Sequence, residues 1–384
     1  MKGPVPLPPT LDTLFPGLGE RLRVASLGVW PTPVDALDGL ASELGRTGAP
    51  LYVKRDDRSS PVYGGNKVRT LEMFFGEALA KNLPRIVATG AYGSNHALAT
   101  VLHAPRVGLS ADVALFPQPA TRTAALGLAA TVAHAAHVTD VFHWSTLPFR
   151  IAALSLRARR PDDPALVMAP GGSSPLGALG YVLAGFELAE QVRSGALPVP
   201  RRVFVGVGSN ATAAGLLVGF ALAARLGLGW QRPPGVVAVR VTPWPVTSRL
   251  RILSLAARTS RLLAERARAP SAIVAARELA PFLEVDGRFL GRGYGYPTRE
   301  GFAAIEHFEN LGLFALDTTY SAKVVSAFIA AVRRDEPGPL LYWSTRSTAP
   351  LPTVVRRSIE RAPRRMQDWL ARAAARFELT WPDA

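Results

Sequence analysis

The stretch Gly64-Gly65-Asn66-Lys67 separates two sequence patterns of different period. Before it, residues 51–54 form a short run that is typical of a strand. After it, apolar residues recur at helical spacing, namely Val68, Leu71, Phe74, Phe75, Ala78 and Leu79. Because two glycines and an asparagine favour a tight turn, the stretch predicts a strand, a turn and a helix, with Lys67 at the start of the helix.

The same order of strand, turn and helix repeats along the chain. The expected strands are 85–89, 111–116, 138–142, 166–169, 203–207 and 236–241, and the expected helices are 97–107, 124–134, 149–159, 176–193 and 213–226. Short buried strands that alternate with helices are typical of parallel sheets covered on both faces. Loops rich in glycine, serine and asparagine follow these strands. Since the chemistry of parallel sheets gathers at the carboxyl ends of their strands, we expect the functional site in those loops.

The composition restricts the class of protein. A chain of 384 residues, 48% of them hydrophobic, is long enough for two domains and too apolar to be disordered. It has no cysteine, which excludes disulfides, thiolate metal sites and cysteine nucleophiles. Residues 1–30 read as an irregular arm without a signal peptide, and no stretch is apolar for long enough to span a bilayer. We therefore expect a cytoplasmic protein with no membrane partner.

The net charge of +15 raises the question of a nucleic-acid partner. Only five of the 44 basic residues are lysines, and the arginines are scattered without interleaved aromatic residues. Basic segments at 248–278 and 355–377 read as helices, the second amphipathic with a solvated basic face. Near residue 140, only Asp140 accompanies three histidines, His134, His137 and His143. We expect neither a nucleic-acid partner nor a metal site.

Lys67 is the first candidate for chemistry. Arginine cannot lose its proton at neutral pH, so a lysine in an arginine-rich chain can be kept for the chemistry of its amine. The alternative is an ordinary surface lysine at the start of a helix.

The second candidate is the loop after residues 203–207, which consists of Gly208, Ser209, Asn210, Ala211 and Thr212. Small residues followed by a helix N-terminus suit an anion such as a phosphate. The spacing Gly206-x-Gly208-x-x-Ala211 also fits a dinucleotide fingerprint, in which only Arg240 is available to read an NADP phosphate. A plain strand-to-helix turn is the third interpretation.

Two further groups of polar residues are each open to two interpretations. Ser94 and Asn95, in Gly93-Ser94-Asn95-His96, suit a carboxylate and a phenolic oxygen, but either residue can also cap a helix. Tyr294 and Tyr320 can line a pocket or simply pack a turn. None of these residues decides a function alone.

The motifs occur in one order along residues 31–350: Pro31 to Val34, Leu51 to Asp57, Gly64 to Arg69, Ser94 to His96, Gly171 to Tyr181, Gly293 to Pro297 and Asp317 to Lys323. Together they resemble the D-cysteine desulfhydrase and 1-aminocyclopropane-1-carboxylate deaminase family. This family belongs to the tryptophan-synthase-β-like group of pyridoxal phosphate (PLP) enzymes, fold type II. The resemblance implies an α/β fold of two three-layer domains with mostly parallel sheets. Residues 1–68 and 174–384 would form the large PLP-binding domain, and residues 69–173 a small domain inserted in it.

The resemblance also implies roles for the residues around PLP. Lys67 would carry the cofactor as a Schiff base and move the Cα proton of the substrate. Asn95 would bind the phenolic oxygen, the loop from Gly208 to Thr212 the phosphate, and Thr345 would face the pyridine nitrogen.

The implied substrate is a small amino acid. Ser94 would bind its carboxylate, and Tyr294 and Tyr320 would line its pocket. Arg55-Asp56-Asp57 and Ser94-Asn95-His96 look more like the desulfhydrase branch of the family. That branch implies β-elimination from D-cysteine or a similar amino acid to pyruvate, ammonia and sulfide, in a homodimer.

The sequence departs from the family pattern at three places. Asn210 and Ala211 stand where the phosphate loop usually has glycines, Arg346 interrupts a His-Thr-Gly-Gly motif, and Gly93 replaces a glutamine. Since these places touch the pocket, a non-catalytic or substrate-shifted relative is an alternative, and an NADP-binding oxidoreductase is a weaker one.

Overall fold

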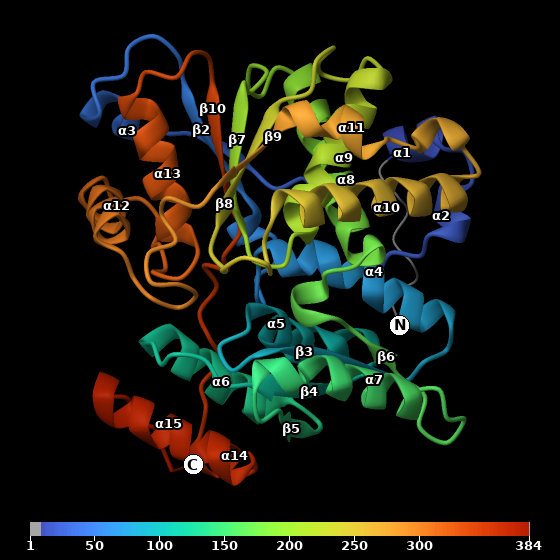
Figure 1. Cartoon of the computed structure of the whole chain (residues 1–384), viewed down its shortest axis with the longest axis vertical. Coiled ribbons are helices and arrows are strands. Elements are labelled where there is room, and N and C mark those ends of the chain that lie inside the picture. Colours follow the sequence, from blue (N-terminus) through green and yellow to red (C-terminus); the bar gives the residue numbers. More distant parts are fainter. Residues whose placement is uncertain (1–8, 384) are drawn as a thin grey trace.

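The structure, a computed structural model, describes residues 9–383 and contains two separate sheets, one above the other (Figure 1). Residues 1–8 of the expected irregular arm lie outside the described residues. The rest of the arm is not irregular throughout, because it contains α1 (Pro9–Leu14) and α2 (Leu18–Arg21). Leu18 and Leu22 are buried in the core that covers one face of the large sheet. Burial of such apolar side chains fixes the segment against that core.

The large sheet has six strands in the order β1-β2-β10-β7-β8-β9. The antiparallel pair β1-β2 lies at one edge, and the other neighbouring strands are parallel. The strands are β1 (Val34–Ala36), β2 (Leu51–Arg55), β7 (Arg202–Val207), β8 (Gly235–Arg240), β9 (Leu283–Asp286) and β10 (Leu340–Ser344). The expected strands at 203–207 and 236–241 are thus confirmed, whereas β1, β9 and β10 were not among the strands expected.

Helices cover both faces of the large sheet. In β10, Leu341 and Trp343 face one core cluster while Leu340 and Tyr342 face the other, as the two-residue period of a strand requires. The first cluster is built with α8 (Pro175–Arg193), α9 (Ala211–Arg225), α10 (Arg249–Ala267) and α11 (Ala276–Leu279), and the second with α3 (Asp38–Glu43), α12 (Arg299–Asn310) and α13 (Ser321–Arg333). The predicted α/β class with mostly parallel sheets is confirmed.

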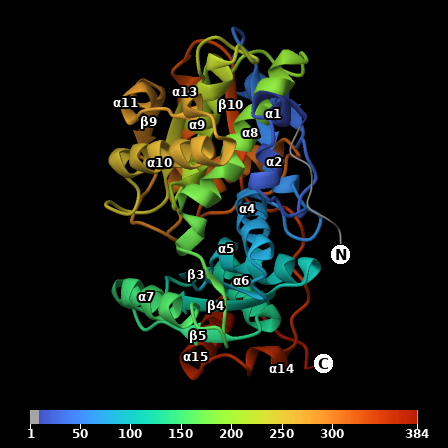
Figure 2. The same ribbon diagram turned by 90° about the vertical axis from the view of Figure 1, so that its right-hand side faces the viewer.

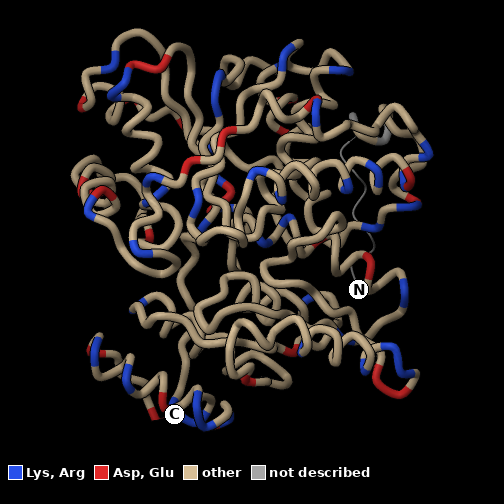
Figure 3. Tube along the Cα trace, viewed as in Figure 1, with Lys and Arg blue, Asp and Glu red and all other residues tan. Residues whose placement is uncertain are grey.

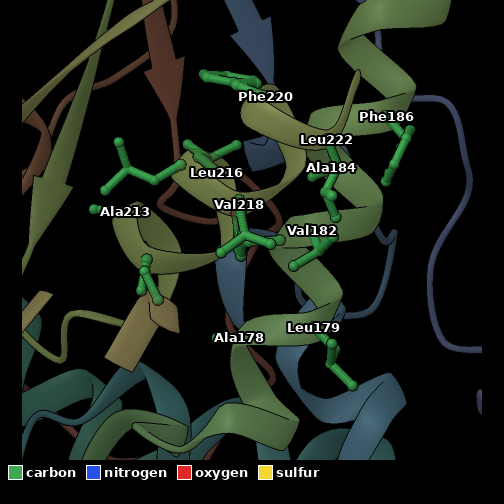
Figure 4. Close-up of a cluster of buried hydrophobic side chains, with 14 of the residues drawn as sticks. Ala178, Leu179, Val182, Ala184, Phe186, Ala213, Leu216, Val218, Phe220 and Leu222 are labelled. Carbon is green, nitrogen blue, oxygen red and sulfur yellow. The ribbon is translucent and has the colours of Figure 1, made fainter. Parts of the chain in front are cut away.

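Helices α8 and α9 pack closely, and Figure 4 shows the buried apolar side chains that both contribute to the core. Glycines permit the approach. A Cβ atom on Gly215 would lie 2.3 Å from the carbonyl oxygen of Ala178, and one on Gly219 would lie 2.6 Å from that of Val182. Both distances are far below van der Waals contact, so only glycine fits at these two positions of α9. This packing fixes the N-terminus of α9, which includes the last two residues of the loop 208–212.

The small sheet has four parallel strands in the order β5-β4-β3-β6. They are β3 (Arg85–Ala91), β4 (Ser110–Phe116), β5 (Val138–Asp140) and β6 (Leu166–Val167), all at expected places. One face packs on α4 (Asn66–Ala80), α5 (Asn95–His103) and α6 (Arg122–His134), and the other on α7 (Leu147–Arg157). Within residues 9–383, no helix has both the length and the apolar character needed to cross a bilayer.

The C-terminal segment packs beneath the small sheet (Figure 2). It forms α14 (Arg356–Ile359) and α15 (Arg364–Phe377), and both contact α6. Met366, Leu370 and Ala373 recur at helical spacing and are buried in the core of the small part. The sequence assigned this segment to the large domain, but its apolar stripe joins it to the small one. The boundaries of the two domains otherwise stay a prediction.

Basic residues are spread over the whole trace of the molecule (Figure 3). The four arginines of α15 lie mostly on its solvent side, since Arg364, Arg372 and Arg376 are exposed and Arg365 is half-buried. This agrees with the predicted solvated basic face of the C-terminal helix.

Candidate active site

Lys67 lies in the first turn of α4, and the backbone before it is fixed by β10. The amide of Asn66 donates a hydrogen bond to the carbonyl of Thr345 (2.9 Å), directly after the last residue of β10. Gly65 has φ +89°, and a Cβ atom on it would lie 2.5 Å from the same carbonyl oxygen. Only glycine combines this conformation with this approach. The Gly-Gly-Asn turn therefore ties the start of α4 to the end of β10.

The amine of Lys67 is held inside the protein. Its Nζ donates a hydrogen bond to the carbonyl of Gly171 (3.0 Å) and lies 3.5 Å from Oγ of Ser209. Burial disfavours the charged form and lowers the pKa of Lys67 to about 8. More of the unprotonated amine is therefore present at neutral pH than for a surface lysine. The segments after β6 and after β7 therefore meet at the side chain of a residue in the first turn of α4.

The loop from Gly208 to Thr212 has its carbonyl groups tied to neighbouring hydroxyls. The Gly208 carbonyl accepts from Thr242 (3.2 Å) and Thr247 (3.0 Å), and the Ser209 carbonyl accepts from Ser173. In a trans peptide the N–H of the next residue points opposite to the carbonyl. The amides of Ser209 and Asn210 therefore point away from these hydroxyls. With the free amides at the N-terminus of α9, they form a set of donors suited to a phosphate.

The two substitutions in this loop leave its backbone in a shape that suits glycine. Asn210 has φ +69°, a region that asparagine tolerates better than most residues. Its Nδ2 donates to the carbonyl of Val246 (3.0 Å), and its Oδ1 is buried without a partner among the described residues. Ala211 is buried in the core of the large part. Both side chains are therefore engaged outside the set of free amides.

Asn95 and Ser94 lie at the start of α5, after the end of β3. The hydroxyl of Tyr63 donates to Oδ1 of Asn95 (2.8 Å), so the NH₂ group is the free end of that amide. An NH₂ group is the donor that an anionic phenolic oxygen requires. Oγ of Ser94 accepts from the amide of Ala97 (3.3 Å), which makes Ser94 the N-cap of α5. The helix-cap interpretation of Ser94 is thus confirmed, and its role toward a substrate stays a prediction.

Tyr294 and Tyr320 form a pair. Their hydroxyls are 2.8 Å apart and their rings meet edge to face. Burial raises the pKa of Tyr294 to about 12 and that of Tyr320 further, so both phenols stay protonated. The ring of Tyr320 lies beside Gly208, where a Cβ atom would be 3.7 Å from its Cε1. The tyrosine pair therefore lies next to the loop 208–212.

Two residues of this region had no predicted role. Tyr63 was missed, because an aromatic residue before a Gly-Gly turn carries no specific signal. His96 was noticed only as part of a motif. It is buried, both of its ring nitrogens lack hydrogen-bond partners among the described residues, and burial and the nearby Lys67 lower its pKa well below the usual value.

The third departure from the family pattern, Gly93, is accompanied by a glutamine from another element. The amide of Gly93 donates to Oε1 of Gln118 (3.1 Å), which lies after β4. A Cβ atom on Gly93 would lie 2.6 Å from that of Ala124. A glutamine side chain at position 93 therefore does not fit, and Gln118 lies beside it instead.

The residues around Lys67 fit PLP. An amine of lowered pKa, a free amide NH₂ group and a set of loop amides suit an aldehyde, a phenolic oxygen and a phosphate. Thr345 lies directly after β10 with its carbonyl bound to the start of α4. Among residues 9–383 no cluster of histidine, aspartate and glutamate is arranged to hold a metal ion.

Comparison with known proteins agrees with this fit. Residues 25–340 match the family described as pyridoxal-phosphate dependent enzyme. The chain is 32% identical to the nocardicin C-9′ epimerase of Nocardia uniformis subsp. tsuyamanensis over 323 residues, which cover 83% of this chain and 90% of the epimerase. It is also 32% identical to the D-cysteine desulfhydrase of Serratia proteamaculans (strain 568) over 325 residues, which cover 82% and 90%.

A solved structure described as an ACC deaminase homologue superposes with a TM-score of 0.70 at 24% identity and covers 88% of this chain and 95% of its own. This likeness supports the fold. The match over 25–340 includes the loop 206–211 and rules against the dinucleotide interpretation of that loop. The chain belongs to the pyridoxal-phosphate-dependent enzymes, in the fold type II group of D-cysteine desulfhydrase and ACC deaminase, and its cofactor is PLP.

Proposed function

We propose that this enzyme is a carbon–sulfur lyase that converts D-cysteine, or a similar small amino acid, to pyruvate, ammonia and sulfide. The observation that carries the proposal is the amine of Lys67, bound to Gly171 with its pKa lowered to about 8. The 32% identity to a D-cysteine desulfhydrase supports the choice of substrate.

We propose three contacts to the cofactor. Lys67 would hold it through its amine, Asn95 through its free NH₂ group, and the loop from Gly208 to Thr212 would hold the phosphate through backbone amides. When bound, PLP supplies an electron sink that stabilises negative charge at the Cα atom of the substrate.

The side chains of this chain then divide the proton transfers between them. The amine of Lys67 removes the Cα proton, for which its lowered pKa suits it. The electron pair of the Cα–H bond forms the Cα–Cβ double bond, and the sulfur leaves with the Cβ–S pair. The protonated pair of Tyr294 and Tyr320 donates a proton to the leaving sulfur. Water then replaces the nitrogen of the released enamine, which gives pyruvate and ammonia.

Epimerisation of an amino acid is a second candidate, because an epimerase is among the relatives at 32% identity. Both reactions begin with removal of the Cα proton by a base. They differ in the next step, since an epimerase returns a proton to Cα and leaves the Cβ substituent in place.

The test begins with the absorption spectrum of the purified protein, before and after borohydride, and continues with peptide mapping. We expect a visible band that borohydride removes, with the reduced adduct on Lys67. Incubation with D-cysteine should then release pyruvate and sulfide in equal amounts. Exchange of the Cα hydrogen with D₂O without pyruvate would favour the epimerase. An adduct on another residue would contradict the assignment of Lys67.

Two further expectations from the sequence stay predictions. We propose that the enzyme acts as a homodimer, on the strength of the family resemblance, and light scattering of the holoenzyme tests this. Its location in the cytoplasm is testable by fractionation of the cells that produce it.

A further inference from the structure

Arg346 lies at the edge of the active site. It comes directly after Thr345 at the end of β10 and forms an isolated bridge with Gly65, two residues before Lys67. Its side chain lines a cavity of about 350 Å³. Tyr63, whose hydroxyl binds Asn95, lines the same cavity. The cavity therefore shares a wall with the proposed cofactor site.

The guanidinium of Arg346 lacks a hydrogen-bond acceptor for its Nε among the described residues, and this nitrogen is buried. The carboxylate of Asp317 lies 3.9 Å from that nitrogen, which is too long for a hydrogen bond. The oxygens of Asp317 already accept from the amides of Thr319, Tyr320 and Ser321. Asp317 thus shapes its own turn, and Arg346 keeps donors for another acceptor.

The other nearby charges do not neutralise Arg346. Both carboxylate oxygens of Asp57 accept from Arg55, at 3.0 and 2.8 Å. Burial lowers the pKa of Lys323 to about 8, and the charge of Asp317 opposes this shift, so Asp317 also acts on a second basic side chain. Among the described residues that line the cavity, Arg346 is the charged one, so the lining is positive.

From this geometry we propose that Arg346 binds a carboxylate at the end of the substrate's side chain, so that the preferred substrates are amino acids whose leaving group is itself acidic. The proposal rests on the proposed lyase function and specifies its substrate class. The planar fork of a guanidinium matches a carboxylate with two parallel hydrogen bonds. Ser347 and Thr348 line the same cavity.

A matched pair of substrates tests the proposal with the holoenzyme. S-carboxymethyl-D-cysteine and its carbamoylmethyl amide have nearly the same shape, and each gives pyruvate, ammonia and a thiol on elimination. We expect kcat/KM to favour the acid by about tenfold or more, as a charge-assisted hydrogen bond would. In Arg346→Met, which keeps much of the side-chain volume, the ratio should fall to about one. Arg346→Lys should keep part of the preference, because it keeps the charge without the fork.

Several outcomes would overturn the proposal. Equal rates for the acid and the amide in the wild-type enzyme would do so. So would an equal loss on both compounds in Arg346→Met, since Arg346 would then bind the α-carboxylate or serve the fold alone.

A second measurement separates this proposal from the lyase function on which it rests. Thermal unfolding of wild-type and Arg346→Met holoenzyme with each compound needs no turnover. Stabilisation by the acid alone, lost in the variant, supports the carboxylate site even if D-cysteine yields no pyruvate. Equal shifts with both compounds contradict a substrate side-chain site. Pyruvate from D-cysteine then still supports the lyase function.

Discussion

Two clusters of buried polar side chains lie a few residues apart on α4, and they differ in how well their groups are paired. In the first, which we term the buried ion network, Arg69 donates two hydrogen bonds to Asp56 and two to Glu187, at 2.8 to 2.9 Å. Lys54 donates to Glu187, to Gln191 and to a backbone carbonyl. The network joins β2, α4 and α8 with every charge opposed.

In the second cluster, around Lys67, several polar atoms lack partners. Both ring nitrogens of His96, Nε of Arg346 and Oδ1 of Asn210 are buried without a hydrogen bond among the described residues. Such groups are costly, and proteins keep few of them. The difference indicates that the network holds the start of α4 in place, and that unpaired groups such as those of His96 and Arg346 are available to molecules that bind near Lys67.

The largest expected effect is on the reaction rate, in the cluster around Lys67. Replacing Lys67 by alanine removes the proposed base, so the rate of pyruvate formation should fall by about 10² to 10⁴-fold or more. The borohydride adduct should disappear, while the melting temperature of the cofactor-free protein should not fall, because a buried amine is lost. Lys67→Arg is the control, since arginine keeps the charge but cannot act as an amine. Turnover that survives in either variant would contradict the role of Lys67.

A substitution in the buried ion network should lower the free energy of unfolding. Arg69→Met leaves Asp56 and Glu187 buried without their main counter-charge, and breaking such a pair costs about 3–5 kcal/mol of unfolding free energy. Denaturant unfolding of the cofactor-free protein measures this. The exposed Arg372→Met is the matched control and should change stability by about 0.5 kcal/mol or less. Equal effects of the two variants would show that the network contributes nothing special.

The sequence predicted the two clusters unequally. Lys67 and the loop 208–212 stand out because glycine turns and helix starts are local signals. The network is invisible in the sequence, because Glu187 lies more than a hundred residues from Arg69 and only folding brings them together. Tyr63 has no local signal either, since its partner Asn95 lies 32 residues away at the start of α5.

Short elements were also hard to predict. β1 and β9 have three and four residues, too few to show a period of two. The amphipathic character of α15 was visible in its apolar stripe, but that stripe does not say which sheet it covers. A helical period predicts a buried face and leaves its partner open.

A titration sharpens the comparison further. The pKa of Lys67 is lowered to about 8 from the ordinary 10.5, so between these values the unfolded chain binds more protons than the folded one. The free energy of unfolding of cofactor-free protein should therefore rise with pH across this window, by about 1–3 kcal/mol, and the cost of burying the charge should be fully present below it. Urea unfolding at several pH values measures the slope. In Lys67→Ala, the contribution of Lys67 to this slope should be absent. The same slope in the wild type and the variant would mean that the amine is not effectively buried.

The smallest effect is expected at Asn210, whose side chain has one hydrogen-bonded atom, Nδ2, and one buried atom without a partner among the described residues, Oδ1. Asn210→Gly loses the hydrogen bond to Val246 but also removes an unpaired oxygen, and glycine adopts φ +69° freely. The net change in stability should be within about 1 kcal/mol, whereas Asn210→Ala adds backbone strain of about 1–2 kcal/mol. Since the side chain is engaged away from the loop amides, PLP affinity should be the same in Asn210→Gly as in the wild type. Much tighter PLP binding by the glycine variant would contradict this expectation. It would mean that the Asn210 side chain crowds the phosphate.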